Sequence, residues 1–232
     1  MNIQEKFEEY DTNRDGFIEL DELKTGLGIE EDEAKKLFEQ FDENKDGKLD
    51  FEEFKHLMLK REFDVFDLNN DGKLQLNELM EGYKMEEEAA KKIIAKYDDN
   101  KDGCLQFDEF RRWLHDVFLQ NEFNHFDSSK DGFLQPDELK TGYRLEEDAI
   151  TKIFKEFDSN SDGKLDFNEF YKWQVTEEFK KFDKNNDGQL DKDEIMSGLR
   201  CDEKEAKEFI VKYDKDNDGT IDLNEWYGVW KI

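Results

Sequence analysis

The chain has few of the features that mark secreted, membrane-spanning or lipid-anchored proteins. No run approaches the roughly 20 apolar residues of a membrane span. The first ten residues lack the basic and apolar segments of a secretory signal, and position 2 is not the glycine that myristoylation requires. Two cysteines, Cys104 and Cys201, make no disulfide framework. A reducing, cytoplasmic setting is the simpler interpretation, and a mature secreted protein that has lost its signal is the alternative.

Positive charge is also scarce. The chain has 35 Lys and Arg against 63 Asp and Glu, which gives a formal net charge of −28. This balance argues against nucleic acid or an anionic membrane surface as a partner and suits cations or basic partners. His56, His115 and His125 show no metal-ligand spacing, and no glycine-rich phosphate loop or nucleophile motif occurs. We therefore expect no enzyme.

The acids that are present follow a twelve-residue pattern, D-x-[NDS]-x-D-G-x-[IL]-x-x-x-E, which occurs eight times. The eight loops are Asp11–Glu22, Asp42–Glu53, Asp67–Glu78, Asp98–Glu109, Asp127–Glu138, Asp158–Glu169, Asp183–Glu194 and Asp214–Glu225. This is the spacing of a calcium-binding loop.

Each loop supplies the 6–8 oxygen ligands that calcium prefers. Positions 1, 3 and 5 give side-chain oxygens, position 7 a backbone carbonyl, position 9 a ligand that often acts through water, and position 12 a bidentate Glu. Position 6 is Gly in every loop because the turn there is costly with a Cβ. In chain order the predicted ligands are Asp11, Asn13, Asp15, Phe17, Glu19, Glu22; Asp42, Asn44, Asp46, Lys48, Asp50, Glu53; Asp67, Asn69, Asp71, Lys73, Gln75, Glu78; Asp98, Asn100, Asp102, Cys104, Gln106, Glu109; Asp127, Ser129, Asp131, Phe133, Gln135, Glu138; Asp158, Asn160, Asp162, Lys164, Asp166, Glu169; Asp183, Asn185, Asp187, Gln189, Asp191, Glu194; and Asp214, Asp216, Asp218, Thr220, Asp222, Glu225. We predict up to eight Ca2+ ions, with Mg2+ as a competitor, and a spectator role for the Cys104 thiol.

Apolar residues flank every loop at helical spacing. An aromatic residue precedes each loop, another apolar residue lies three positions earlier, and an apolar residue follows, as Phe7, Tyr10 and Leu23 do around the first loop. Spacing of three places two residues on one helix face. The pattern therefore predicts eight helix–loop–helix units whose aromatic residues form the core.

The spacing of the loops shows how these units combine. Loop starts are separated by 31, 25, 31, 29, 31, 25 and 31 residues, and the series indicates two tandem halves, 1–116 and 117–232. The 31-residue spacings contain a glycine, which we expect to end the exiting helix. These glycines are Gly26, Gly82, Gly142 and Gly198. Loops 1–2, 3–4, 5–6 and 7–8 are therefore predicted to form pairs.

The shorter links predict helices shared between loops. The 13 residues of Phe54–Phe66 and of Phe170–Phe182 contain no Gly or Pro, so each is expected to be one continuous helix. The 17-residue link Phe110–Phe126 also lacks both residues. It forms a shared helix or bends at Asn121 and Asn124, which are poor helix formers.

The chain resembles the EF-hand superfamily, which includes calmodulin, calbindins and sarcoplasmic calcium-binding proteins, over nearly its whole length. The resemblance implies reversible calcium binding in loop pairs. We predict an all-α fold of eight EF-hands in four pairs, in which Ile or Leu at position 8 joins paired loops in a short β ladder.

The loops differ in charge. Among positions 1, 3, 5, 9 and 12, loop 8 has five acids, loops 1, 2, 6 and 7 have four, and loops 3, 4 and 5 have three. Because ligand charge tunes affinity, loop 5, with Ser129 at position 3, is predicted to be among the weakest.

Three functions fit these loops. A monomeric cytoplasmic calcium buffer or store is favoured because little sequence lies outside the loops. A sensor that binds a basic amphipathic target peptide is the first alternative, weakened by the presence of only 5 methionines. A calcium-responsive contractile or assembly element is the second.

Overall fold

The computed structural model describes residues 3–42 and 44–230. The chain divides into two compact units, Met1–Trp113 and Leu114–Ile232, with the boundary inside helix α7 (Phe107–Phe126). The division after residue 116, which rests on the internal repeat, stays a prediction.

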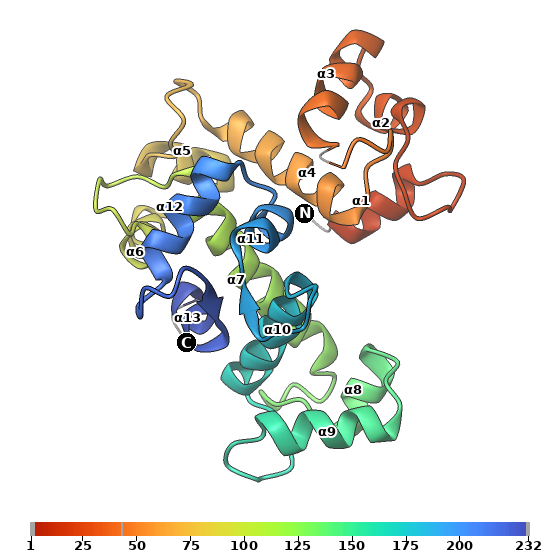
Figure 1. Cartoon of the computed structure of the whole chain (residues 1–232), viewed down its shortest axis with the longest axis vertical. Coiled ribbons are helices and arrows are strands. Elements are labelled where there is room, and N and C mark those ends of the chain that lie inside the picture. Colours follow the sequence, from red (N-terminus) through yellow and green to blue (C-terminus); the bar gives the residue numbers. More distant parts are fainter. Residues whose placement is uncertain (1–2, 43, 231–232) are drawn as a thin grey trace. The chain divides into compact units, whose positions relative to one another are not determined.

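Short helices and loops alternate along the whole of the described chain (Figure 1). The first unit contains α1 (Ile3–Tyr10), α2 (Leu20–Leu27), α3 (Glu31–Phe41), α4 (Phe51–Phe66), α5 (Leu76–Tyr83), α6 (Glu87–Tyr97) and the start of α7. The second unit contains the rest of α7, α8 (Pro136–Gly142), α9 (Glu147–Phe157), α10 (Phe167–Phe182), β1 (Gln189–Leu190), α11 (Lys192–Leu199), α12 (Glu203–Tyr213), β2 (Ile221–Asp222) and α13 (Leu223–Trp230). None of the described helices combines the length and apolar character that a membrane crossing needs.

The repeated pattern sets where the helices begin and end. Each helix that enters a loop ends on the predicted aromatic residue, and each exiting helix begins at loop position 10. At the entry of the first loop, the N–H of Asp11 still donates to Phe7 O at 2.8 Å before the chain leaves the helix. Pro136 occupies the first turn of α8, where its missing N–H is tolerated.

The predicted shared helices are present. Helices α4 and α10 each run for 16 residues, and α7 runs for 20 residues as one helix, so Asn121 and Asn124 do not interrupt it.

Backbone hydrogen bonds at position 8 join the loops in the predicted pairs. Ile18 and Leu49 exchange two N–H···O bonds of 2.8 Å. Leu74 with Leu105 and Leu134 with Leu165 form the same isolated bridge. In the last pair the bridge extends to the two-residue strands β1 and β2. The predicted all-α fold, with four pairs and short ladders between their loops, is confirmed.

Buried apolar residues directly follow the loops. The residue that follows each loop has 0 % of its surface exposed in all eight hands. These residues are Leu23, Phe54, Leu79, Phe110, Leu139, Phe170, Ile195 and Trp226. Each exiting helix is therefore anchored immediately after the position-12 Glu.

The predicted role of the linking glycines was wrong for three of the four. Helices α2, α5 and α11 continue past Gly26, Gly82 and Gly198, and only α8 ends at its glycine, Gly142. Helix α2 instead ends at Gly28, which has a left-handed φ of 64°. The glycines are needed for close packing, because a Cβ on any of them would meet the aromatic ring before the odd-numbered loop at under 3.0 Å. The rings are those of Tyr10, Phe66, Phe126 and Phe182.

This packing generates a stability prediction. Gly198→Ala should destabilise the protein by about 1–3 kcal/mol, because the new methyl group overlaps the Phe182 ring. The matched control is Gly228→Ala in α13, where the Cβ would meet only the flexible end of Lys215. That change should be neutral or stabilise by up to about 1 kcal/mol, because alanine is the better helix former. Urea unfolding of both variants in one buffer measures the difference; equal midpoints would contradict the packing role.

Candidate metal sites

Two positions have the same left-handed backbone conformation in all eight loops. The position-6 glycines have φ between 78° and 91°, and a Cβ there would meet nothing within 4 Å. The glycine is therefore needed for its conformation and not for space. Position 4 is also left-handed in every loop, although it is never glycine. These residues are Arg14, Lys45, Asn70, Lys101, Lys130, Ser161, Asn186 and Asn217. Sequence reasoning missed this position, and only its three asparagines carry a recognisable left-handed preference.

Backbone N–H groups orient the side chains at positions 1, 3 and 5. In the first loop Gly16 N donates to Asp11 Oδ2 at 3.0 Å, Asp15 N to Asn13 Oδ1 at 2.8 Å, and Phe17 N to Asp15 Oδ1 at 3.0 Å. The bonds from position 6 to position 1 and from position 7 to position 5 recur in all eight loops. The loop is thereby fixed with its ligand side chains gathered along its inner edge.

Loop 5 departs from this arrangement. Ser129 at position 3 donates its hydroxyl to Asp127 Oδ1 at 3.1 Å, where the other loops have an Asn or Asp that accepts from position 5. Its closing residue, Glu138, is also the only position-12 Glu that is not buried. Both differences agree with the low calcium affinity that its three acidic ligands predict for loop 5.

The position-12 Glu closes its loop through both carboxylate oxygens in the seven loops that the structure describes in full. In the first loop Glu22 Oε2 accepts from Glu19 N at 3.0 Å, and Glu22 Oε1 accepts from Thr12 N at 2.9 Å. The bond from position 9 recurs in all eight loops. Burial raises the pKa of Glu22, but the Glu19 N–H, the Thr12 hydroxyl and the N–H groups of Asn13 and Thr12 together outweigh it and hold the pKa below its usual range. Hydrogen-bond donors of the loop thus favour the charged form of this carboxylate.

Position 9 has a structural role that the ligand pattern did not anticipate. Where it is Asp, its side chain accepts from the N–H of position 12 and caps the exiting helix, as Asp50 does for Glu53 at 2.8 Å. Where it is Gln, the amide donates to the position-5 Asp of its own loop, as Gln75 does to Asp71 at 2.7 Å.

The last loop gathers the most negative charge. One carboxylate oxygen from each of Asp214, Asp216 and Asp218 lies within 4.8 Å of the others. The Asp218 N–H lowers the pKa of Asp216, but desolvation and the charges of Asp218, Glu225 and Asp214 outweigh it, so the pKa is raised. A bound cation would therefore reduce the electrostatic repulsion among these carboxylates.

These sites fit a hard divalent cation. Their side-chain donors are carboxylate and amide oxygens, with a hydroxyl in loop 5, and hard cations such as calcium take oxygen ligands. In loop 2, Asp42 Oδ1 is buried and accepts no hydrogen bond from the described residues. A metal ion at the loop would satisfy this oxygen.

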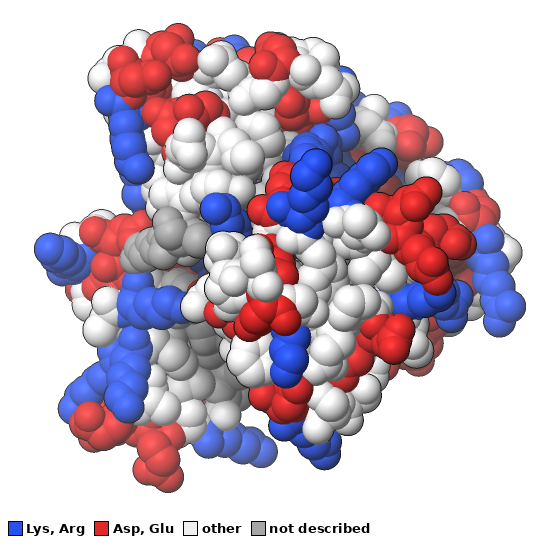
Figure 2. Space-filling view, turned by 90° about the horizontal axis from the view of Figure 1, so that it is seen from below, with Lys and Arg blue, Asp and Glu red and all other residues white. Residues whose placement is uncertain are grey.

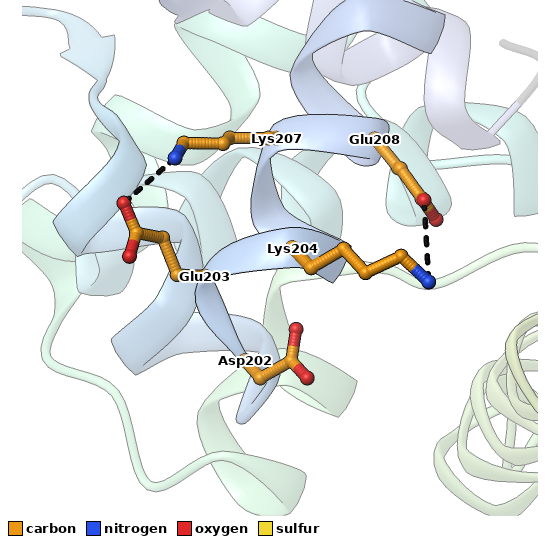
Figure 3. Close-up of a pocket in the computed structure, with 5 residues that line it drawn as sticks. All are labelled: Asp202, Glu203, Lys204, Lys207 and Glu208. Carbon is orange, nitrogen blue, oxygen red and sulfur yellow. Dashed lines mark ion pairs between the residues drawn. The ribbon is translucent and has the colours of Figure 1, made fainter.

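Outside the loops, the described residues include no cluster of three or more acidic, His or Cys side chains close enough to hold a metal ion. A shallow depression at the start of α12 is lined by charged side chains, with Lys207 paired to Glu203 at 2.8 Å and Lys204 to Glu208 at 3.7 Å (Figure 3). These pairs lie on the exposed surface, and all the residues that line the depression are charged. The face shown in Figure 2 has acidic and basic side chains interspersed, without a wide basic field.

Comparisons with known proteins find relatives that share these loops. Calcium-binding protein LPS1-alpha from Lytechinus pictus is 31% identical over 108 residues, which cover 40% of this chain and 34% of that protein. Troponin C, isoform 2A, from Homarus americanus is 28% identical over 107 residues, or 39% of this chain and 71% of the relative. The chain thus spans about a third of the length of the first relative.

A solved structure also matches. It is that of a homolog of programmed cell death 6 protein from Leishmania major Friedlin, 27% identical, covering 62% of this chain and 93% of that chain with a TM-score of 0.28.

A family model decides the assignment. The model of the EF-hand domain pair matches residues 1–59, 57–114, 116–175 and 174–231, and each match contains two of the loops described above. The chain therefore belongs to the EF-hand family, as a run of four EF-hand domain pairs.

Proposed function

We propose that this protein binds calcium reversibly at its eight loops and serves as a calcium buffer or store, acting by binding and not by catalysis. One observation carries the proposal: in all eight loops the position-12 Glu accepts from the N–H of position 9, and the position-1 carboxylate accepts from the N–H of position 6. Eight such loops in 27.8 kDa give a high binding capacity for the mass. The name of the Lytechinus pictus relative supports the choice of metal.

The ligand set proposed for each loop is that of the sequence pattern. Side chains at positions 1, 3 and 5 would bind the ion, with the position-7 carbonyl and both oxygens of the position-12 Glu. Position 9 would act through water, because the Asp side chains there also cap a helix. A bidentate Glu suits the seven-coordinate geometry of calcium better than the octahedral geometry of magnesium, which we propose as a competitor.

A buffer is favoured over a sensor by the placement of the apolar residues. Sensor grooves use flexible methionines that become exposed. Met58 is 5% exposed and belongs to the core of the first pair. The exposed large apolar residues Val65, Leu68 and Val211 line neither of the two described pockets.

Calcium removal should strongly destabilise the protein. One site held at 100 times its dissociation constant adds about 2.7 kcal/mol to the free energy of unfolding. With roughly 2–4 °C per kcal/mol for a chain of this size, even two such sites raise the melting temperature by more than about 10 °C. Calorimetry with excess calcium and with EDTA measures the shift, and returning calcium should restore it. An unchanged melting temperature would refute calcium binding.

The loops should differ in affinity. Glu225→Gln, in the loop with five acids, should abolish the tightest calcium-binding step, and Glu138→Gln should remove one of the weakest. Each change should weaken its own loop by about tenfold or more, because the carboxylate is a proposed bidentate ligand. Titration against a competing chelator resolves the steps. Glu88→Gln, at an exposed residue of α6 outside any loop, is the control. It should change neither the tightest nor the weakest calcium-binding step. If Glu225→Gln and Glu138→Gln weakened the tightest calcium-binding step equally, the predicted ranking of the loops would be refuted.

A final measurement separates the buffer from its alternatives. For a buffer, adding calcium should not increase the binding of a dye specific for exposed apolar surface. Small-angle scattering should show little change in dimensions between calcium levels at which the protein is folded. Trp113 and Trp173, which are 7% and 5% exposed and pack against Tyr83 and Tyr143, report on the exit helices by fluorescence. Calcium-induced dye binding would instead indicate a sensor, and a large change in dimensions a contractile element.

A further inference from the structure

A lysine crosses from one loop to its partner in three of the four pairs. Lys48 Nζ of loop 2 lies 2.7 Å from Asp15 Oδ2 of loop 1. Lys73 of loop 3 lies 2.8 Å from Asp102 of loop 4. Lys164 of loop 6 completes the set, 3.2 Å from Asp131 of loop 5. Each lysine stands at position 7 of its own loop, and each carboxylate stands at position 5 of the other.

The pairing of the loops explains this contact. An antiparallel bridge at position 8 sets position 7 of one loop opposite position 9 of the other, as Gln189 and Asp222 are paired in the last hands. A long side chain at position 7 therefore extends over the neighbouring loop. Lys48 accordingly also reaches Glu19 Oε1, at position 9 of loop 1, at 3.2 Å.

Aromatic rings help to hold two of these lysines in place. Lys48 Nζ lies 5.3 Å from the centre of the Phe17 ring, and Lys164 Nζ lies 4.8 Å from that of Phe133. Both rings are at position 7 of the loop that receives the lysine. The ammonium group is thus bound by a ring face and a carboxylate of the same loop.

Within each of these pairs only one loop receives the lysine. The loops that provide the lysine receive none in return. Their partners have no basic residue at position 7, where Phe17, Cys104 and Phe133 stand. The corresponding position-5 carboxylates are those of Asp46, Asp71 and Asp162. The last pair has no lysine at position 7. There Gln189 Nε2 donates to the Asp218 carboxylate at 3.4 Å, so the side chain that crosses between the loops is an uncharged amide.

We propose that the position-7 lysine lowers the calcium affinity of the loop it reaches, so that loop 1 binds more weakly than loop 2, loop 4 more weakly than loop 3, and loop 5 more weakly than loop 6. The inference rests on the proposed calcium binding. The ammonium group neutralises a carboxylate that the ion needs and repels the ion as a like charge. Acid counts alone make loops 1 and 2 equal, and loops 3 and 4 equal. The lysine therefore sets an order that ligand composition does not contain.

The test uses the full chain and follows each loop separately. The backbone N–H of the position-6 glycine donates to the position-1 carboxylate, so its amide resonance responds to its own site, Gly16 for loop 1 and Gly47 for loop 2. In a calcium titration of the wild type, the Gly47 signal should change at lower calcium than the Gly16 signal. Lys48→Gln should tighten loop 1 about two- to fivefold, the range for exposed charge pairs, and should change loop 1 more than loop 2, which keeps its position-7 carbonyl.

Two further variants make the test specific. Lys45→Gln removes the same charge from exposed position 4 of loop 2 and should leave loop 1 within error. Gln189→Lys places a lysine beside Asp218 and should weaken loop 8 by a similar factor. In calcium-free buffer, Lys48→Gln should lower the melting temperature more than Lys45→Gln does, because clustered carboxylates lose a counter-ion.

The outcomes separate this inference from the proposed function. Glycine signals that do not respond to calcium in the wild type would overturn calcium binding itself. A wild type that binds, with loop 1 unaffected by Lys48→Gln or equally affected by Lys45→Gln, would overturn only the role of the lysine.

Discussion

The pair of backbone hydrogen bonds at position 8 is the contact on which the rest of each EF-hand pair depends. It joins the two loops of a pair directly through their backbones, and both position-8 side chains are completely buried, as Ile18 and Leu49 are. Because the bridge is antiparallel, it also fixes which side chains of one loop lie over the other. Pairing, core formation and the contact between position 7 and position 5 all follow from this register.

The position-12 Glu adds a second link, from the loop to the helix that leaves it. Its carboxylate accepts hydrogen bonds from both ends of the loop, and the residue after it is fully buried. Any movement of this carboxylate therefore moves the start of a helix that is anchored in the core. An ion bound by Glu22 or Glu225 would be coupled to helix position in this way, whether the cell uses that coupling or only the binding capacity.

Much of this architecture could be predicted from the sequence because the repeated pattern is local. Aromatic residues such as Tyr10 mark the helix ends, and the absence of Gly and Pro marks the shared helices. What could not be predicted depends on contacts distant in sequence. Gly198 was interpreted as a helix end because its contact with the Phe182 ring is invisible in a linear pattern. The crossing of Lys48 to Asp15 needs the register of the bridge, and the left-handed conformation at Lys101 has no clear sequence signal.

The length of a shared helix sets the rotation of the next hand about the helix axis as well as its distance along the chain. Helix α4 is the exit of loop 2 and the entry of loop 3, and α10 is the same for loops 6 and 7, each with 16 residues. A helix turns about 100° for each residue, so one residue added or removed would rotate everything beyond it by that angle. The apolar face of the following hand would then point away from its own core. Unlike a flexible linker, such a segment tolerates substitutions more readily than any change in its length.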